Sequence, residues 1–413
     1  LLGYASFAHF KLDNTMAKTP ANVRRLLETM WKKARVRSAE EAADLAELIA
    51  ADGHNHAVAP WDWRHYSEKV RAARFDFNEA EIKPYLQLEK MIEAAFATAE
   101  KLFGITIRQQ EDVLTYHPDV RVFEVSNADG NRIAIFLGDY FARSSKRSGA
   151  WMSSFQDQHR IAGENGDEEQ IPFVLNVMNF AKAASGEPVL ITMDDARTLF
   201  HEFGHALHGM LSNVTYPSIS GTSVSRDFVE LPSQLFEHWL TVPEVLQEYA
   251  VHHQTGEPIP EALLEKLQAA GKFNKGFANV EFTSSALVDM AFHALSPEQA
   301  VDVDPVAFEA DVLSEIGMPD EIVMRHATLH FAHVFSGDGY SAGYYSYMWS
   351  GVLDSDAYRA FEETGDPFDP TTAEKLYRHI YSSGGSMDPE DAYIAYRGKL
   401  PTADALIAKE GLA

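Results

Sequence analysis

The chain has 413 residues, enough for a large apolar core and for more than one lobe. Its 35 basic and 61 acidic residues give a formal net charge of −26, which would repel phosphate groups and argues against nucleic acid or an anionic membrane as the main partner. Cysteine is absent, so disulfides and thiol chemistry are excluded, and any metal must be held by His, Asp or Glu.

The beginning of the chain bears on where the protein resides. No charged-then-apolar leader opens it, and no apolar run is long enough to span a bilayer, which predicts a cytoplasmic protein without a membrane partner. Because the chain begins at Leu1 rather than at methionine, we expect it to be part of a longer protein, and a periplasmic or secreted location stays an alternative.

Residues 15–110 are predicted to be mostly helical, because their apolar residues recur at helical spacing. Thr19 is the expected N-cap of the first long helix, with Pro20 at its first position and Gly53 after its end. Gly104 is expected to end the last helix of this segment.

Residues 113–193 have the alternating pattern of strands. A hairpin is expected over 120–141, with its turn at Asp129-Gly130, and further strands over 171–180 and 188–192. The polar stretch 143–170 between them is expected to be irregular, and the chain from Asp194 onward to be helical again. We therefore expect a mainly α fold with one small embedded β-sheet, divided into a helical segment (1–110) and a larger region (111–413).

The sequence HEFGH, residues 201–205, lies inside an apolar, helix-forming run. Residues four apart share one face of a helix, so His201 and His205 would present two imidazoles to one point, with Glu202 beside them. Histidines in this spacing bind zinc, and the glutamate, which is not a ligand, takes a proton from a water that the metal makes acidic. The alternative is a pair of histidines satisfied by hydrogen bonds within a helix bundle.

A catalytic zinc needs a third protein ligand and one open position. Pro232 is best tolerated in the first turn of a helix, which places Glu230 close to the start of the helix that follows the motif. We predict that Glu230 completes a His, His, Glu set for one Zn²⁺ per chain. The alternative for Glu230 is a first-turn acid that complements the helix dipole.

Three polar residues near the predicted ligands are not expected to bind metal. His208 falls one turn beyond His205 and is expected to pack or to support a ligand. Gln234, one turn beyond Glu230, is expected to hydrogen-bond a ligand and fix its orientation. The nearest later histidine, His238, lies on the same helix as Gln234.

Residues 326–349 hold three histidines and four tyrosines around a glycine-rich loop. Such hydroxyl and imidazole donors can stabilise the oxyanion of a tetrahedral intermediate. Taken alone, the stretch is equally typical of an aromatic core with glycines at a turn.

Three stretches together, HEFGHALH, DFVELPSQLFEHW and HFAHVFSGDGYSAGYYSYMW, resemble the zinc peptidases of the thimet oligopeptidase and neurolysin family. The bacterial peptidyl-dipeptidase (dipeptidyl carboxypeptidase) branch of this family looks most similar. The likeness extends through MAKTP, PWDW, GDYFAR and RGKLP, and so covers essentially the whole chain. It implies a zincin-like, two-lobed body with a deep channel, and a sheet whose edge strand can hold an extended peptide.

Carried over by position, the resemblance implies that the zinc ligands are His201, His205 and Glu230, and that Glu202 is the general base. The region 111–413 would then be the zinc-peptidase catalytic region, and 1–110 part of the channel wall. Members of the family are longer at the N-terminus, so we expect the chain to lack much of the opposing lobe, unless a missing N-terminal segment of the same protein serves as its partner.

The resemblance also assigns roles in the glycine-rich loop. It implies that His333 is the histidine of the substrate-binding loop and that Tyr340 contacts substrate. It implies that Tyr347 and Tyr344 lie near the transition-state oxyanion.

The predicted activity is zinc-dependent hydrolysis of short peptides with release of C-terminal dipeptides. An endo-acting oligopeptidase of the same family and an inactive zinc-binding fragment are the alternatives. Release of a C-terminal dipeptide needs a donor for the free carboxylate, and we predict that Arg226 contributes to it. The alternative for Arg226 is a local pair with Asp227 or another acid.

Overall fold

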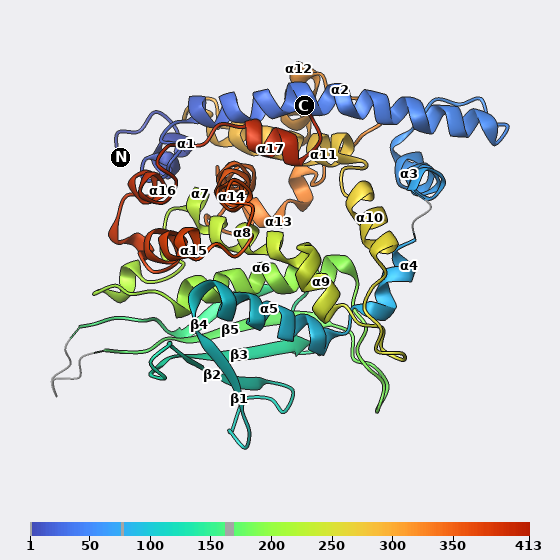
Figure 1. The fold of residues 1–413 in the computed structure, drawn as a ribbon. Helices are drawn as coiled ribbons and strands as arrows, with labels where there is room; N and C mark the ends of the chain where they lie inside the picture. The colour runs from blue at the N-terminus through green and yellow to red at the C-terminus, as the bar shows by residue number, and fades with distance from the viewer. Residues whose placement is uncertain (1, 76–77, 162–168) are drawn as a thin grey trace.

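The computed structural model describes residues 2–75, 78–161 and 169–413, and these are mainly helical (Figure 1). The expected cap is confirmed, because the Thr19 side chain accepts a hydrogen bond from the Asn22 amide at 3.2 Å and Pro20 is the first helical residue. Gly53 and Gly104 follow their helices with φ of +84° and +64°, as their predicted roles require. The helices before the sheet are α1 (Phe7–Leu12), α2 (Pro20–Ala51), α3 (Pro60–Phe75), α4 (Glu79–Ile82) and α5 (Leu88–Phe103).

The strands form one mixed sheet in the order β1-β2-β3-β5-β4. Strands β3 and β5 pair in parallel, whereas the other neighbouring strands pair antiparallel. The strands are β1 (Thr106–Gln110), β2 (Arg121–Ser126), β3 (Arg132–Phe141), β4 (Trp151–Gln156) and β5 (Phe173–Phe180).

Two of the predicted strand features are confirmed. The hairpin is β2–β3, and Asn127 Oδ1 holds its turn by accepting hydrogen bonds from the Asp129 and Asn131 amides at 3.1 and 2.9 Å. The strand predicted over 171–180 is β5. Residues 188–192 form only an isolated bridge, between Leu190 and Gln87, rather than a strand of the sheet.

The expectation of irregular structure over 143–170 is wrong for β4, which lies inside this stretch; residues 162–168 lie outside the described part. Both β4 and the unexpected strand β1 are edge strands, and their sequences WMSSFQ and TIRQQ are partly exposed along their length. An edge strand buries less apolar surface than a central one, so its sequence carries a weaker strand signal.

Helices dominate after the sheet, as expected. They are α6 (Met193–Met210), α7 (Arg226–Val229), α8 (Leu231–Leu240), α9 (Pro243–Tyr249), α10 (Glu261–Ala270), α11 (Lys275–His293), α12 (Pro305–Ile316), α13 (Ala332–Phe335), α14 (Ser346–Glu362), α15 (Pro370–Leu376), α16 (Pro389–Arg397) and α17 (Asp404–Lys409). Short 3₁₀ or π turns add η1 (Lys83–Tyr85), η2 (Pro217–Ile219), η3 (Thr328–His330), η4 (Tyr377–Tyr381) and η5 (Gly384–Ser386).

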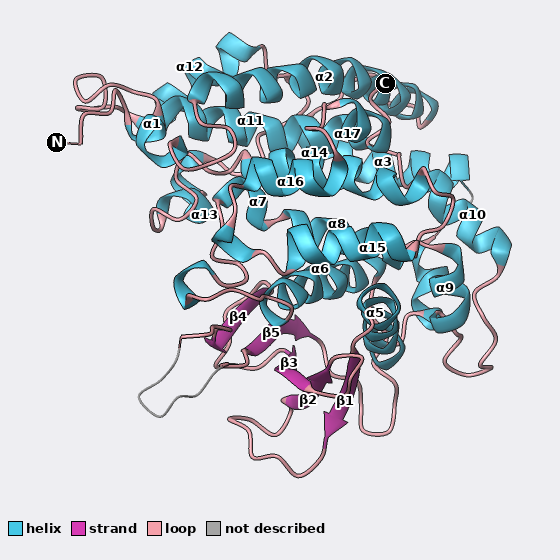
Figure 2. Cartoon of the chain, turned by 60° about the vertical axis from the view of Figure 1, so that its left-hand side comes forward, coloured by secondary structure: helices cyan, strands magenta, loops and turns pink. Residues whose placement is uncertain are grey.

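The elements are stacked in layers. Figure 2 shows the sheet at one end of the molecule, with α6 next to it, α8 beyond α6 and α14 beyond α8. The long helix α2 packs along α11 on the side away from the sheet (Figure 1). None of the described helices combines the length and the apolar character that crossing a bilayer requires.

Buried apolar side chains gather in two main clusters. One surrounds the sheet, α5, α6 and α8, and the other surrounds α2, α3, α11 and α17. Helix α14 joins them, because Leu353 and Phe361 belong to the first cluster and Met348 and Val352 to the second. The HEFGH helix therefore belongs to the first core and the tyrosine-rich stretch to the second, and α14 joins the two cores. The division of the chain at residue 110 stays a prediction.

Candidate metal centre

Helix α6 carries the HEFGH motif, and its start is fixed by local hydrogen bonds. The Thr192 side chain accepts from the Asp195 amide at 3.0 Å, and the Asp195 carboxylate accepts from the Thr192 amide at 2.9 Å, which is a capping box. Phe200 and Phe203 are fully buried in the first core, whereas His201 and His205 lie on a partly exposed face. The burial of one face of α6 therefore turns the two imidazoles outward together.

Gly204, inside the motif, allows α6 and α8 to approach closely. A β-carbon at this position would lie 2.7 Å from the Ser233 α-carbon and 2.8 Å from the Pro232 carbonyl oxygen. Both of these atoms are backbone, so they could not move aside without shifting α8. The glycine thus brings the start of α8, and with it Glu230, against the two histidines.

Glu230 lies where the sequence predicts it, at the start of α8. It ends α7 and immediately precedes α8, whose first turn contains Pro232. Its Oε2 atom is 3.0 Å from His205 Nε2 and 3.3 Å from His201 Nε2. One atom each from His201, His205 and Glu230 lies within 4.8 Å of the other two, which is close enough for all three to hold one ion.

The charges of this group suit a cation. Burial by itself lowers the pKa of His201, but hydrogen bonds that the ring donates to the Glu230 and Glu237 carboxylates outweigh burial and raise that pKa well above the usual value. Burial likewise opposes ionisation of Glu230, yet the two imidazoles hold its pKa well below the usual range. Two histidine nitrogens and one carboxylate oxygen are the donor set of catalytic zinc sites that keep one position open, so these residues fit a zinc ion.

Glu237 supports His201, and the sequence interpretation missed it. Its Oε1 atom is 2.7 Å from His201 Nδ1, so it orients the ring through the nitrogen that faces away from Glu230. Gln234, which was expected to orient a ligand, instead donates to the Tyr347 carbonyl oxygen at 3.2 Å. The sequence contained one signal for this role, which is the spacing of Glu237 from Glu230. Glu237 follows Glu230 by two helical turns and so lies on the same helix face.

Glu202 is buried beside the candidate metal group, which consists of His201, His205 and Glu230, and Glu202 is not part of that group. Its side chain is 6% exposed, and Oε2 has no hydrogen-bond partner in the described structure. Burial raises the pKa of Glu202, while the imidazoles of His201 and His205 lower it by a smaller amount. A buried carboxylate with one oxygen unpartnered, next to a candidate metal group, is available to exchange a proton.

The tyrosine-rich stretch faces Glu230 from the side of α14. Tyr340 donates its hydroxyl to Glu230 Oε1 at 3.2 Å, and the Tyr347 hydroxyl is 3.1 Å from His333 Nε2. The rings of Tyr340 and Tyr347 are stacked, with centroids 5.7 Å apart and 3° between their planes. Tyr344 is 5% exposed and contacts the cluster through the His333 and Tyr347 rings. Its predicted place near an oxyanion stays a prediction.

Arg226 lies over the face of Tyr340, with its guanidinium carbon 4.3 Å from the ring centroid. The alternative partner, Asp227, has its carboxylate occupied elsewhere. It accepts from the Met16 and Ala17 amides at 3.0 and 2.9 Å and from the Tyr345 hydroxyl at 2.9 Å. Arg226 is thus held beside the metal group by an aromatic ring that itself contacts Glu230.

His208 is placed as expected, in the packing of α6 rather than at the metal group. It is fully buried and neither ring nitrogen has a partner in the described structure. Burial lowers the pKa of His208 to about 3, so the ring is neutral.

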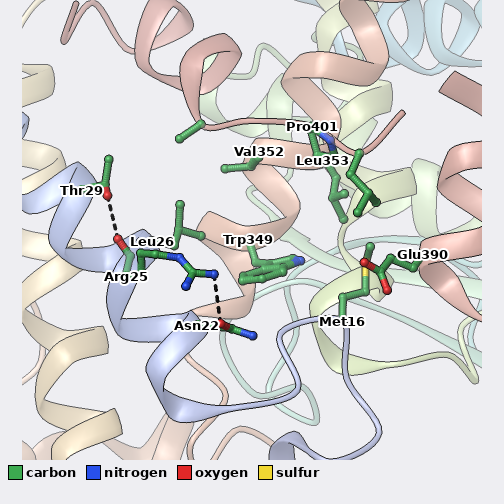
Figure 3. Close-up of a pocket in the computed structure, with 12 residues that line it drawn as sticks. Met16, Asn22, Arg25, Leu26, Thr29, Trp349, Val352, Leu353, Glu390 and Pro401 are labelled. Carbon is green, nitrogen blue, oxygen red and sulfur yellow. Dashed lines mark hydrogen bonds between the residues drawn. The ribbon is translucent and has the colours of Figure 1, made fainter. Parts of the chain in front are cut away.

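In the described part of the chain, one hollow beside α14 adjoins Glu237, the residue that contacts His201. This hollow of about 430 Å³ is lined by Gln234, Glu237 and Tyr347, and therefore opens beside His201. Another, of about 470 Å³, lies between α2 and α14 and is lined by Arg25 and Trp349 among others (Figure 3). The second holds none of the predicted site residues, whereas the first holds Tyr347 and is therefore a candidate substrate cleft.

Two imidazoles from α6, a carboxylate at the start of α8 and a buried glutamate beside them form a candidate metal site. Residues 1–412 match the family described as Peptidase family M3, and the chain belongs to this family. Dipeptidyl carboxypeptidase from Escherichia coli (strain K12) is 41% identical over 417 residues, which cover 100% of this chain and 60% of that protein. Oligopeptidase A from Salmonella typhimurium (strain LT2) is 35% identical over 414 residues, with the same coverage. The chain thus spans about 60% of the length of these relatives.

Proposed function

We propose that the chain hydrolyses peptide bonds of short peptides with the help of one zinc ion, and that it releases C-terminal dipeptides. The observation that carries this proposal is the convergence of His201, His205 and Glu230, with the free carboxylate of Glu202 buried beside them. The name of the E. coli relative, dipeptidyl carboxypeptidase, supports dipeptide release.

Zinc held by His201, His205 and Glu230 would supply a Lewis acid that polarises the scissile carbonyl and acidifies a water molecule. Glu202 takes the proton of the attacking water and later gives it to the leaving amine. Its raised pKa suits both steps, because a raised pKa makes the carboxylate a stronger base toward water and brings its pKa closer to the working pH, where one group can both accept and return a proton. Glu237 keeps the ring of His201 in place throughout.

The tyrosines donate hydrogen bonds to the charge that develops on the substrate. Burial raises the pKa of both Tyr340 and Tyr347, so their hydroxyls stay protonated at neutral pH. A protonated hydroxyl near the attacked carbonyl stabilises the oxyanion. Tyr347, paired with His333, and Tyr344 fill this role, while Tyr340 contacts the substrate and Glu230.

The substrate would lie along strand β4. This strand is an edge of the sheet next to α6, and an extended peptide can add to such an edge through backbone hydrogen bonds. Met152 of β4 contributes a backbone hydrogen bond to Glu202, so the edge strand reaches the general base. Arg226 would then hold the free carboxylate at the C-terminal end of the peptide.

The proposal is tested by digesting a defined peptide with a free C-terminus, with and without a chelator, and identifying the products by mass. Dipeptides released in succession from the C-terminus are the expected result, with no hydrolysis in the chelator. Internal cuts would instead indicate an endo-acting oligopeptidase, which the 35% identity to oligopeptidase A makes the second candidate. Zinc bound without any hydrolysis would indicate an inactive zinc-binding fragment.

The role of Glu202 is tested with Glu202→Gln. Zinc content should remain one per chain, while kcat falls by about 100-fold to 10,000-fold because the proton acceptor is lost. Asp194→Asn, an exposed acid in the first turn of the same helix, is the control and should retain wild-type turnover. Wild-type turnover in Glu202→Gln would show that another group is the base.

The role of Arg226 is tested by comparing a free and an amidated C-terminus. The wild type should prefer the free carboxylate by about tenfold or more, and Arg226→Ala should remove that preference, because a charge-assisted hydrogen bond is lost. Arg378→Ala, which removes an exposed arginine paired with Glu374, should keep it. Equal cleavage of both substrates by the wild type would rule out carboxylate capture by Arg226.

A further inference from the structure

The loop that carries Tyr340 and Tyr344 contains a strained residue. Ala342 has φ of +58°, in the left-handed region that residues with a β-carbon rarely adopt. Ala342 is also 1% exposed, so solvent does not stabilise this conformation. The loop needs a partner that favours it, because two residues away Tyr340 must reach Glu230.

Asp289, on α11, is that partner. Its Oδ1 atom accepts a hydrogen bond from the Ala342 amide at 2.9 Å, and its Oδ2 atom accepts from the Tyr344 amide at 3.0 Å. The two carboxylate oxygens therefore hold the backbone at the strained residue and two residues beyond it. His293, one turn later on α11, lies with Nδ1 2.8 Å from Oδ1 and completes the set.

The burial of Asp289 makes this arrangement specific. The residue is 0% exposed, and a buried carboxylate is costly unless hydrogen bonds satisfy it. The loop amides and His293 supply these hydrogen bonds, so the carboxylate and the loop conformation stabilise each other. The Ser341 hydroxyl also supports this turn, because it donates a hydrogen bond to the Val334 carbonyl oxygen at 2.7 Å.

We propose that Asp289 is a positioning residue that holds the loop so that Tyr340 and Tyr347 face the metal group. Its carboxylate bonds the loop backbone and acts on the reaction only through the tyrosines. The effect on catalysis rests on the proposed peptidase function, whereas the effect on the loop does not. Sequence spacing gives no hint of this role, since Asp289 lies between two predicted site segments.

Glu41, on α2, provides a matched control at the other end of α11. It is 4% exposed and accepts hydrogen bonds from the Gly276 and Phe277 amides at 3.0 and 2.8 Å, at the start of α11. Like Asp289, Glu41 is thus a buried carboxylate that accepts hydrogen bonds from two nearby backbone amides. Phe277 lies roughly 18 Å along the helix from Asp289, at 1.5 Å per residue. Within the described residues, Glu41 bonds Gly276, Phe277 and Arg37 rather than the loop.

The experiment compares Asp289→Asn with Glu41→Gln by two measurements on zinc-loaded protein. Hydrogen exchange followed by mass spectrometry reports the protection of the 340–347 backbone, and steady-state kinetics report kcat and KM. Asp289→Asn should speed exchange in this segment by about tenfold or more, because asparagine offers one acceptor where two amides need one each. It should lower kcat by about 100-fold with KM nearly unchanged, as expected for misplaced oxyanion donors. Glu41→Gln should change neither the exchange of this segment nor kcat by more than about twofold.

Each outcome decides the proposal. Unchanged exchange at 340–347 in Asp289→Asn would overturn the anchoring, and faster exchange with wild-type kcat would overturn the functional role. An equal loss of kcat in Glu41→Gln would show that Asp289 affects catalysis only by stabilising the fold. If Asp289→Asn cannot be purified, Asp289→Glu, which displaces the acceptor atoms by one methylene, takes its place with the same expectations. A wild type without chelator-sensitive hydrolysis would instead refute the proposed function, while exchange would still test the anchor.

Discussion

Two clusters of histidine and carboxylate lie along α8, and they differ in what completes them. At the start of the helix, Glu230 meets His201 and His205, and no lysine or arginine is bonded to this group in the described structure. At the other end, His238 Nε2 lies 2.7 Å from Asp354 Oδ1, and Lys409 Nζ lies 2.7 Å from that same oxygen. The second cluster already contains its cation.

This difference explains why similar residues give a candidate site in one place and a structural contact in the other. Asp354 is 2% exposed and its charge is balanced by Lys409, and burial together with Lys409 lowers the pKa of His238. Around Glu230 a second imidazole stands where the other cluster has its lysine, so three donor atoms that could hold one ion come together. The number of donors and the absence of a bonded lysine or arginine in the described structure therefore distinguish the candidate metal group from the structural contact.

The largest expected effect, on zinc binding, comes from replacing one carboxylate in each cluster by its amide. Glu230→Gln should weaken zinc binding by more than the about 100-fold that loss of a supporting residue produces, because a ligand itself is removed. Asp354→Asn should keep one zinc per chain and lose stability instead. Metal analysis after dialysis, together with urea unfolding, checks both variants. Equal zinc loss in the two variants would show that the two clusters do not differ in metal binding.

The next effect concerns the residue that orients His201. Glu237→Gln retains the shape of the side chain but removes its charge, so zinc affinity or kcat should fall by about 10-fold to 100-fold. Competition with a chromophoric chelator measures the affinity. Glu244→Gln on α9, which loses an exposed pair with Lys101 of α5, is the control and should behave as the wild type. Wild-type zinc affinity in Glu237→Gln would show that the 2.7 Å contact contributes nothing to the site.

A smaller effect is expected from removing the cation of the structural cluster. Lys409→Met should lower the free energy of unfolding by about 1 kcal/mol, because the lysine side chain is 40% exposed and solvent screens the pair. Zinc content should stay unchanged, since His238 and Asp354 offer only two donors. Urea denaturation and metal analysis test this, and a second zinc per chain would contradict it.

His208 extends the comparison to a buried histidine whose ring nitrogens have no hydrogen-bond partner in the described structure. Its folded-state pKa of about 3 lies below the ordinary value of 6.5, so the unfolded chain binds a proton that the folded chain does not. Stability from this group is fully present above pH 6.5 and declines as pH falls below it, by about 1 kcal/mol between pH 7.5 and 6. His208→Phe should flatten the pH dependence of the urea midpoint by that amount, and an unchanged slope would show that His208 does not contribute.

The sequence predicted those parts of the site that local geometry controls. His201, Glu202 and His205 follow from the four-residue spacing of one helix face, and Glu230 from the rule that proline sits in a first turn. Asp289 was beyond reach, because nothing in the spacing of the chain reveals that its carboxylate meets the amides of a loop more than fifty residues later.

The fold was predictable to a similar extent. The long helices and the β2–β3 hairpin carry strong periodic or turn signals, and the structure contains them. Strands β1 and β4 were missed because edge strands bury little apolar surface. Glu237 was missed for a different reason. An acid on a partly exposed helix face is ordinarily solvated, and only the packing of α6 beside α8 gives Glu237 its partner His201.

The close contact at Gly204 makes helix spacing a means of adjusting metal affinity. Because backbone atoms of Pro232 and Ser233 occupy the place of its missing β-carbon, any larger residue would act as a spacer between the two ligand-bearing helices. The ligands would all remain in the chain, yet Glu230 would stand farther from both histidines. The fourth residue of HEFGH therefore sets the width of the site, and side-chain volume at a position that binds nothing could tune how tightly the protein holds its ion.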